Sequence, residues 1–359
     1  YGTDADVGNL DLKGKIVFAY FGVTDSSGFR EGIANSGIKA SLLAAKGAVA
    51  LIEIFRQKDA DWKILQGYLG RARTSLGDHP FPVLLLNSGD PAFAASLKGA
   101  GNVKIFTSGN NVTRIPARNV IGMVRGTDLK LMNEYVVLSA HYDHLGVASS
   151  PQEVNGKKDS IYNGARDNAI GVTAVINAAR FFAKHPPRRS LLFILYTAEE
   201  MGLLGSRYFA EHPVLPLNKI VYNLNCDNGG YNDTSIITVI GLGRTSADDD
   251  IRKACEAYDV KAVADPVPEL DLFDRSDNLN LAIKGIPAPT FGMGVTGFDS
   301  VIRKYYHQPG DEVGTFDLRY ALTYIRAYVL AAKNIADNPA QPMWTKDDKY
   351  EAAWKKLYR

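Results

Sequence analysis

Acidic residues and histidines gather directly after several apolar runs in the second half of the chain. These residues are His141, Asp143, Glu199, Glu200 and Asp227, joined by Asp167 at the start of a predicted helix and His307 in a later loop. Ligands at the carboxyl ends of neighbouring strands meet in one crevice, where open α/β sheets place their sites. Imidazole nitrogens and carboxylate oxygens suit zinc and, less selectively, manganese or cobalt. The pattern therefore predicts metal-dependent chemistry.

Five of these residues can serve two metal ions if Asp167 bridges them. One ion would contact His141, Asp167 and Asp227. The other would contact Asp167, Glu200 and His307. Two zinc ions about 3.5–4 Å apart lower the pKa of a shared water and polarise a substrate carbonyl. The expected cofactor is therefore a pair of Zn²⁺ ions in each chain.

Three neighbouring residues are left for other roles. Glu199 adjoins a ligand in sequence but points elsewhere, so it can act as the general base. Asp143 lies on the same side of the strand end as His141 and can accept the second imidazole N–H of that ligand. His144 is predicted to support the site structurally.

Alternating strand-like and helix-like segments must position these side chains. Continuous apolar and β-branched runs indicate strands covered by helices on both faces. Strands are predicted at 120–125, 136–140, 191–196, 220–225, 236–240 and 289–292, and helices at 169–184, 203–211, 247–258, 277–283 and 318–337. The alternation predicts an α/β three-layer sandwich around a mixed, mainly parallel sheet.

Residues 1–116 form a separate region that lacks a cluster of acids and histidines. Strands are predicted there at 15–21, 48–55, 83–87 and 103–107, and helices at 37–46 and 91–98, with glycines between them. We predict an accessory domain over 1–116, a catalytic domain over 117–340 and a helical tail over 341–359. In the tail, Tyr350, Trp354 and Leu357 fall at helical spacing.

The composition excludes other classes of protein. The 359 residues are 46% hydrophobic and 22% charged, as expected of a folded chain with a large core, and the net charge is +2. We therefore expect no nucleic-acid partner. Two cysteines exclude a disulfide scaffold and a cysteine-rich zinc site. No apolar run reaches the roughly 18 residues that span a bilayer.

Five segments resemble the di-zinc aminopeptidases related to bacterial leucyl aminopeptidases and glutamate carboxypeptidase. They are 140–146 (AHYDHLG), 163–171 (NGARDNAIG), 197–206 (TAEEMGLLGS), 225–227 (NCD) and 306–311 (YHQPGD). The resemblance implies a phosphorylase/hydrolase-like zinc exopeptidase fold with the same five zinc ligands, Glu199 as base and Asp143 as the orienting residue. It also implies that Tyr306 contacts the substrate carbonyl and that the peptide between Asp167 and Asn168 is cis. Arg166 departs from the family pattern, because many members have an acid there.

The first region resembles a small α+β protease-associated domain, through residues 14–17 and 39–50. Family members usually carry this domain as an insertion after the first elements of the catalytic domain. The resemblance therefore implies that a further segment precedes Tyr1 in the whole protein. It also implies an exported protein, periplasmic or extracellular, that acts on peptides.

The resemblance favours an aminopeptidase but leaves its specificity open. Phe273, Met293, Phe298 and Tyr305 could line a side-chain pocket and favour an apolar N-terminal residue. A carboxypeptidase that prefers acidic C-terminal residues is the main alternative within the family. A single-zinc glutaminyl cyclase and a non-catalytic binding scaffold are further alternatives. The related two-domain dipeptidases do not fit, because the interval between the last acid and the final histidine is too short for their lid domain.

Overall fold

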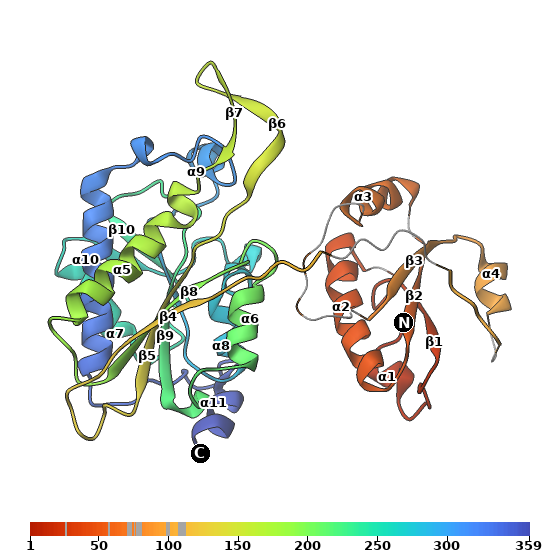
Figure 1. The fold of residues 1–359 in the computed structure, drawn as a ribbon, viewed down its shortest axis with the longest axis horizontal. Helices are drawn as coiled ribbons and strands as arrows, with labels where there is room; N and C mark the ends of the chain where they lie inside the picture. The colour runs from red at the N-terminus through yellow and green to blue at the C-terminus, as the bar shows by residue number, and fades with distance from the viewer. Residues whose placement is uncertain are drawn as a thin grey trace. The chain divides into compact units, whose positions relative to one another are not determined.

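The computed structural model describes the whole chain except residues 26, 57, 70–73, 75, 77–80, 98–100 and 107–112. The chain forms two compact units, Tyr1–Arg114 and Ile115–Arg359 (Figure 1). Each unit has its own sheet and its own buried apolar core.

The first unit is built on a three-stranded parallel sheet. Its strands lie in the order β1 (Ile16–Tyr20), β2 (Ala50–Phe55) and β3 (Val83–Asn87). The helices of this unit are α1 (Asp4–Val7), α2 (Phe29–Ala45), α3 (Asp59–Leu69) and α4 (Pro91–Ser96). Leu43 of α2 and Leu51 of β2 are fully buried in the core of this unit.

Three of the four strands predicted for the first unit are confirmed. The fourth strand, predicted at 103–107, is not observed over 103–106. Residue 107 of that strand and residue 98 of the predicted helix 91–98 lie outside the described residues. Helix α2 begins eight residues before the prediction, and α3 was not predicted. Glycines and an Asn-Ser pair weaken the helical signal in the first half of α2, since these residues have low helix propensity.

The second unit contains a seven-stranded sheet in the order β11-β10-β12-β9-β5-β8-β4. Its strands are β4 (Val120–Val124), β5 (Tyr135–His141), β8 (Ser190–Tyr196), β9 (Ile220–Cys226), β10 (Ile236–Ile240), β11 (Lys261–Val263) and β12 (Thr290–Met293). Only the β4–β8 and β10–β12 pairs are antiparallel. The prediction of a mixed, mainly parallel sheet is confirmed, and the carboxyl ends of β9, β5 and β8 share one edge.

Helices cover both faces of this sheet (Figure 1). Those of the unit are α5 (Ile170–Phe182), α6 (Leu204–Glu211), α7 (Asp248–Glu256), α8 (Asn278–Ile283), α9 (Ser300–Tyr305), α10 (Leu318–Asp337) and α11 (Glu351–Tyr358). Helices α5, α7 and α10 share one buried cluster with the sheet, and α6, α8 and α11 share the other. The strands and helices predicted for this unit match the observed ones to within two residues at each end.

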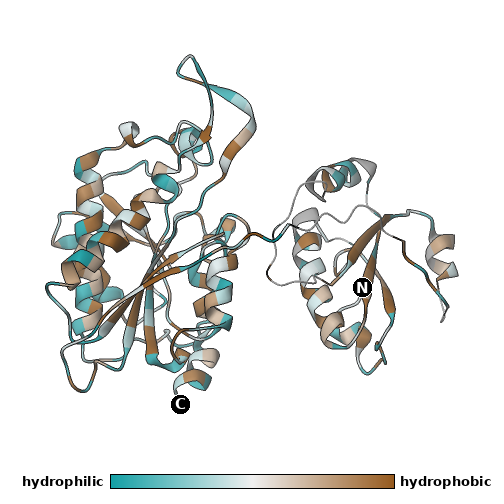
Figure 2. Ribbon diagram, in the orientation of Figure 1, coloured by the Kyte–Doolittle hydropathy of each residue, from teal (hydrophilic) through white to brown (hydrophobic). Residues whose placement is uncertain are grey.

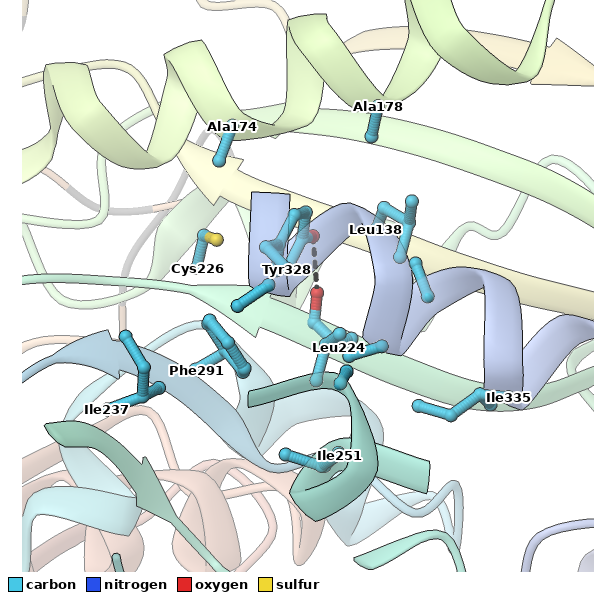
Figure 3. Close-up of a cluster of buried hydrophobic side chains, with 14 of the residues drawn as sticks. Leu138, Ala174, Ala178, Leu224, Cys226, Ile237, Ile251, Phe291, Tyr328 and Ile335 are labelled. Atoms are coloured by element: carbon cyan, nitrogen blue, oxygen red, sulfur yellow. Dashed lines mark hydrogen bonds between the residues drawn. The ribbon is translucent and has the colours of Figure 1, made fainter. Parts of the chain in front are cut away.

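The apolar runs of the central strands supply both clusters. In β5, Val136 and Leu138 belong to the cluster under α5 and α10, whereas Val137 belongs to the opposite cluster. Adjacent side chains of a strand point to opposite faces, and Figure 2 shows the central strands as mainly hydrophobic. In the first cluster, the Tyr328 hydroxyl donates to the carbonyl oxygen of Leu224 over 2.9 Å (Figure 3).

A two-stranded hairpin projects from the second unit (Figure 1). It pairs β6 (Gly146–Val154) with β7 (Lys157–Tyr162) through a turn at Asn155 and Gly156, both with positive φ. The sequence analysis missed the hairpin because its strands are polar and contain no apolar run. The Asn-Gly pair is the signal that could have revealed it, since such pairs favour tight hairpin turns.

The tail packs on the second unit. The predicted tail helix is confirmed as α11, and Trp344, Tyr350 and Trp354 are buried with α6 and α8. Short helical turns complete the unit at Ala165–Ala169 (η1), Leu217–Lys219 (η2), Pro268–Leu270 (η3), Leu272–Arg275 (η4) and Val313–Thr315 (η5). Within the described part of the chain, no helix combines the length and apolarity needed to cross a bilayer.

Candidate metal centre

Three central strands carry the candidate ligands to one edge of the sheet. His141 ends β5, Asp227 follows β9, and Glu199 and Glu200 follow β8. His141 is in register with Tyr196 of β8, so the two parallel strands end side by side. The convergence predicted from the sequence therefore has a direct cause in strand register.

A first group of ligands surrounds the Nε2 atom of His141. This atom lies 3.2 Å from Oδ1 of Asp227 and 3.3 Å from Oδ1 of Asp167. The ligand atoms of the three residues lie close enough together to share one metal ion. His141 and Asp167 are buried, and the three residues come from segments far apart in sequence.

A second group forms around the other oxygen of Asp167. Nε2 of His307 lies 3.2 Å from Oδ2 of Asp167 and 3.3 Å from Oε2 of Glu200. His307 itself has a left-handed backbone conformation, with φ of 56°. The two oxygens of Asp167 therefore face two different histidines.

His144 lies beside this second group. Its Nδ1 atom is 2.7 Å from Oε1 of Glu200, and its ring meets that of His307 edge-on at 5.7 Å. Its Nε2 atom is buried without a hydrogen-bond partner in the described residues. His144, Asp167 and Glu200 also lie close enough to share a metal ion, a position that the sequence analysis did not assign to His144.

The backbone around Asp167 is held by its neighbour Asn168. The peptide bond between the two residues is cis, as the family resemblance implied. Asn168 Nδ2 donates to the carbonyl oxygen of Cys226 over 2.8 Å, and its Oδ1 accepts from Asn228 Nδ2 over 3.2 Å. These bonds tie turn η1 to the end of β9, beside Asp227.

The carboxylate of Asp143 was predicted to accept the second imidazole N–H of His141, and the structure shows a different contact. Nδ1 of His141 lies 3.1 Å from the backbone carbonyl oxygen of Asp143 but 3.9 Å from its carboxylate. The Asp143 carboxylate instead accepts the backbone N–H groups of Glu199, over 3.0 Å, and Glu200, over 3.2 Å. The carbonyl rather than the carboxylate is thus placed to select the tautomer of His141.

The site concentrates negative charge. Burial and the charge of Asp227 raise the pKa of Glu199 far above its usual range. Burial opposes protonation of His307, but hydrogen bonds to Asp167 and Glu200 raise the pKa of His307 to about 9. Among the ion pairs of the described residues, no lysine or arginine neutralises Asp167, Asp227, Glu199 or Glu200. Buried carboxylates that are not paired with a lysine or arginine are well suited to bind a metal cation.

A cavity of about 540 Å³ opens beside the two groups. Glu199, Tyr306 and His307 line it. The Tyr306 ring is stacked on that of His307, with 4.1 Å between centroids. Gly229 lies beneath Tyr306, where a Cβ atom would approach the ring to 2.9 Å.

The four residues expected to line a specificity pocket fall into two sets. Met293 and Phe298 line the cavity. Phe273 instead packs in the core against Trp344 and Tyr350, and the ring of Tyr305 stacks on the guanidinium of another residue. Phe273 belongs to turn η4, and the two residues that follow it, Asp274 and Arg275, line the cavity. The sequence therefore indicated the correct segment but the wrong residue.

Comparison with known families matches residues 119–331 to Peptidase family M28. The matched segment runs from the residue before β4 into α10 and contains every candidate ligand.

Two individual relatives share about a quarter of their aligned residues with this chain. The probable leucine aminopeptidase 2 of Aspergillus oryzae is 27% identical over 269 residues, which cover 72% of this chain and 50% of that protein. Aminopeptidase YwaD of Bacillus subtilis is 26% identical over 206 residues, which cover 56% of this chain and 41% of that protein. The chain thus spans half or less of the length of these relatives.

The solved structure of an aminopeptidase from Aneurinibacillus sp. strain AM-1 has a similar fold. It superposes with a TM-score of 0.51 at 22% identity, over 97% of this chain and 75% of that chain.

Proposed function

The chain belongs to peptidase family M28, and from that premise we propose that it is a zinc metallopeptidase that removes residues from the N-terminus of peptides. The orientation of the Asp167 carboxylate carries this proposal. Its Oδ1 lies 3.3 Å from Nε2 of His141, and its Oδ2 lies 3.2 Å from Nε2 of His307. A carboxylate presented in this way can bridge two ions.

In the proposed enzyme, His141, Asp167 and Asp227 would hold one Zn²⁺. Asp167, Glu200 and His307 would hold the other. The two ions would supply Lewis-acid chemistry, activating a water and polarising the scissile carbonyl. We assign His307 rather than His144 to the second ion, because the Nε2 atom of His307 lies 3.2 Å from Asp167 and 3.3 Å from Glu200, whereas His144 contacts Glu200 alone.

The remaining residues move protons and position groups. Glu199 takes a proton from the attacking water and passes it to the leaving amine. The Tyr306 hydroxyl, whose pKa is raised by burial, stays protonated and donates to the carbonyl oxygen of the substrate. Asp143 holds the backbone from which Glu199 projects.

The cavity supports a preference for a free N-terminus and an apolar first side chain. Glu199 is the lining carboxylate that is neither a proposed zinc ligand nor paired with a lysine, and it can attract an α-ammonium group. Its apolar part is formed by Ile240, Val267, Leu272, Met293, Val295, Phe298 and Ile302. Small-molecule sites usually combine an apolar pocket with a few polar groups that orient the ligand.

One observation favours a carboxypeptidase as the second candidate. Arg275 is exposed, lines the cavity and makes no hydrogen bond or ion pair with the residues that the structure describes. A free guanidinium can bind the C-terminal carboxylate of a peptide in bidentate fashion. The two relatives described above are named aminopeptidases, so we rank the aminopeptidase first.

A peptide panel separates these candidates. Purified protein with added zinc is assayed on matched peptides that are unblocked, N-acetylated or C-amidated. Loss of hydrolysis on N-acetylation, with C-amidation tolerated, supports the aminopeptidase, and the opposite pattern supports the carboxypeptidase. Cyclisation of N-terminal glutamine with one zinc per chain would instead indicate a glutaminyl cyclase. A folded protein without metal or turnover would indicate a binding scaffold.

We propose two further features from the resemblance of the sequence to di-zinc aminopeptidases that carry a protease-associated domain. Unit Tyr1–Arg114 serves as a protease-associated accessory domain, and the protein acts outside the cytoplasm. Removal of that unit should leave hydrolysis of aminoacyl-anilides largely intact. Fractionation of the native host should place the protein in the periplasm or the medium.

A further inference from the structure

Arg166, directly before Asp167, is almost completely buried, with 3% of its surface exposed. A buried guanidinium is costly unless its charge is paired and its N–H groups are bonded. Arg166 meets both conditions through one segment of chain, Tyr305–Phe316, which also contains His307.

The partner of its charge is Asp311, itself 1% exposed. Nη1 of Arg166 lies 3.0 Å from Oδ1 of Asp311. The other oxygen, Oδ2, accepts the backbone N–H of Arg166 over 2.8 Å and that of Asp167 over 3.2 Å. One carboxylate therefore balances the guanidinium and fixes the backbone of the central candidate ligand.

Arg166 also contacts two other residues of the segment that contains His307, Thr315 and Tyr305. Its guanidinium donates to Oγ1 of Thr315 over 2.6 Å and to the carbonyl oxygen of Thr315 over 2.8 Å. On the other side of His307, the guanidinium stacks on the Tyr305 ring at 3.8 Å. The segment that bears His307 is thus held before and after the histidine.

The first group of ligands has separate support. His141 and Asp227 lie at the ends of adjacent parallel strands, β5 and β9. Asn168 bonds the turn that carries Asp167 to the end of β9. His307, by contrast, lies in a loop after the short helix α9.

We infer that Arg166 and Asp311 are positioning residues that hold the His307 segment against Asp167 and so set the affinity of the second metal site. The inference rests on the proposed di-zinc function. Loss of the Arg166 guanidinium weakens the Asp167–Glu200–His307 site and leaves the His141–Asp167–Asp227 site nearly unchanged. Loss of the Asp311 carboxylate also releases the backbone of Asp167, a ligand of both sites. Substitution of residues that orient ligands commonly reduces metal affinity about 10–100-fold.

The experiment measures zinc affinity by competition with a chromophoric chelator, without reference to turnover. R166M removes the charge, and R166K keeps the charge but not the forked hydrogen bonds. D311N removes the charge of the partner and keeps an acceptor. R189K is the matched control, because Arg189 is fully buried, pairs with Glu134 and lies at the opposite end of β8.

Wild-type protein and R189K should bind two zinc ions with the same affinities. R166K should keep one wild-type affinity and lose about 10–100-fold in the other, with turnover recovered by excess zinc. D311N should weaken the second site at least as much and the first site less, because Asp311 also bonds the backbone of Asp167. R166M should show the larger loss; if it does not fold, R166K and D311N decide the outcome. Two wild-type affinities in both R166K and D311N, or equal loss at both sites in R166K, would overturn the inference. A wild-type protein that binds fewer than two zinc ions would instead refute the proposed di-zinc function, before any variant is compared.

Discussion

The carboxylate of Asp143 accepts the backbone N–H of Glu199, with 3.0 Å between Oδ1 and N. Asp143 follows β5 and Glu199 follows β8, so the bond joins the ends of two parallel strands. It fixes the turn from which the proposed base projects, at a point where Ala198 has a positive φ of 55°. The position of the base therefore depends on a residue outside the metal set.

Substitution of Asp143 should test this dependence. In D143A the N–H groups of Glu199 and Glu200 lose their acceptor, so we expect lower kcat and roughly 10–100-fold weaker zinc binding through Glu200. D128A is the matched control, because Asp128 also accepts two successive backbone N–H groups, those of Lys130 and Leu131. Equal effects of the two substitutions on zinc binding would show that Asp143 has no special role.

Substitution of the base should separate chemistry from metal binding. E199Q keeps the size of the side chain but cannot take a proton, so we expect kcat to fall about 10²–10⁴-fold. Zinc content, measured by atomic absorption, should remain that of the wild type. Residual activity near the wild-type level would mean that another group is the base.

The two histidines near Glu200 should differ in their effect on metal content. H307N should reduce zinc to about one ion per chain, and asparagine tolerates the left-handed backbone of this position. H144N should keep two ions, because we assign His144 to orienting Glu200 rather than to the metal. The reverse pattern, with metal lost only in H144N, would exchange the two roles.

A glycine beside the proposed bridging ligand should resist substitution. A Cβ atom on Gly171 would lie 2.3 Å from Oδ1 of Asn168, whose amide is buried and bonded to Cys226 and Asn228. We expect G171A to lower stability by roughly 1–3 kcal/mol, measured by urea unfolding, since the packed amide cannot move away freely. G297A is the control, because a Cβ atom there has no heavy atom within 4 Å.

The stability of the metal-free protein should fall as the pH rises from 6 to 9. Burial opposes protonation of His141, but Asp227 and Asp167 raise the pKa of His141 well above its usual range; the pKa of His307 is about 9. Each folded histidine keeps a proton that the unfolded chain releases above about pH 6.5. Burial and Asp227 raise the pKa of Glu199, which acts in the same direction.

Folding therefore takes up protons in this window, and the free energy of unfolding declines with pH. Urea midpoints of chelator-treated protein at pH 6, 7, 8 and 9 should decrease steadily. Each extra proton held by the folded state lowers the free energy of unfolding by about 1.4 kcal/mol per pH unit. Zinc-loaded protein should not show this decline, because the ligands bind metal in their deprotonated forms. Constant or rising midpoints in the metal-free protein would contradict the charge balance described above.

The sequence by itself determined the sheet and the set of candidate ligands. Apolar runs such as 191–195 form strands buried on both faces, and parallel pairing then brings His141, Glu200 and Asp227 to one edge. This inference needs only local periodicity and the direction of strands. The hairpin β6–β7 could not be predicted in this way, because its strands are polar and carry no apolar periodicity.

Only the tertiary structure decided which neighbours hold those ligands. Arg166 looked like a departure of unknown effect, yet it pairs with Asp311, which lies 145 residues further along the chain. The carboxylate of Asp143 holds Glu199 and Glu200 rather than His141, and Phe273 packs in the core rather than in the cavity. Such pairings depend on side-chain directions and loop paths that bring distant segments within about 3 Å, the range of a hydrogen bond, and local sequence patterns do not encode them.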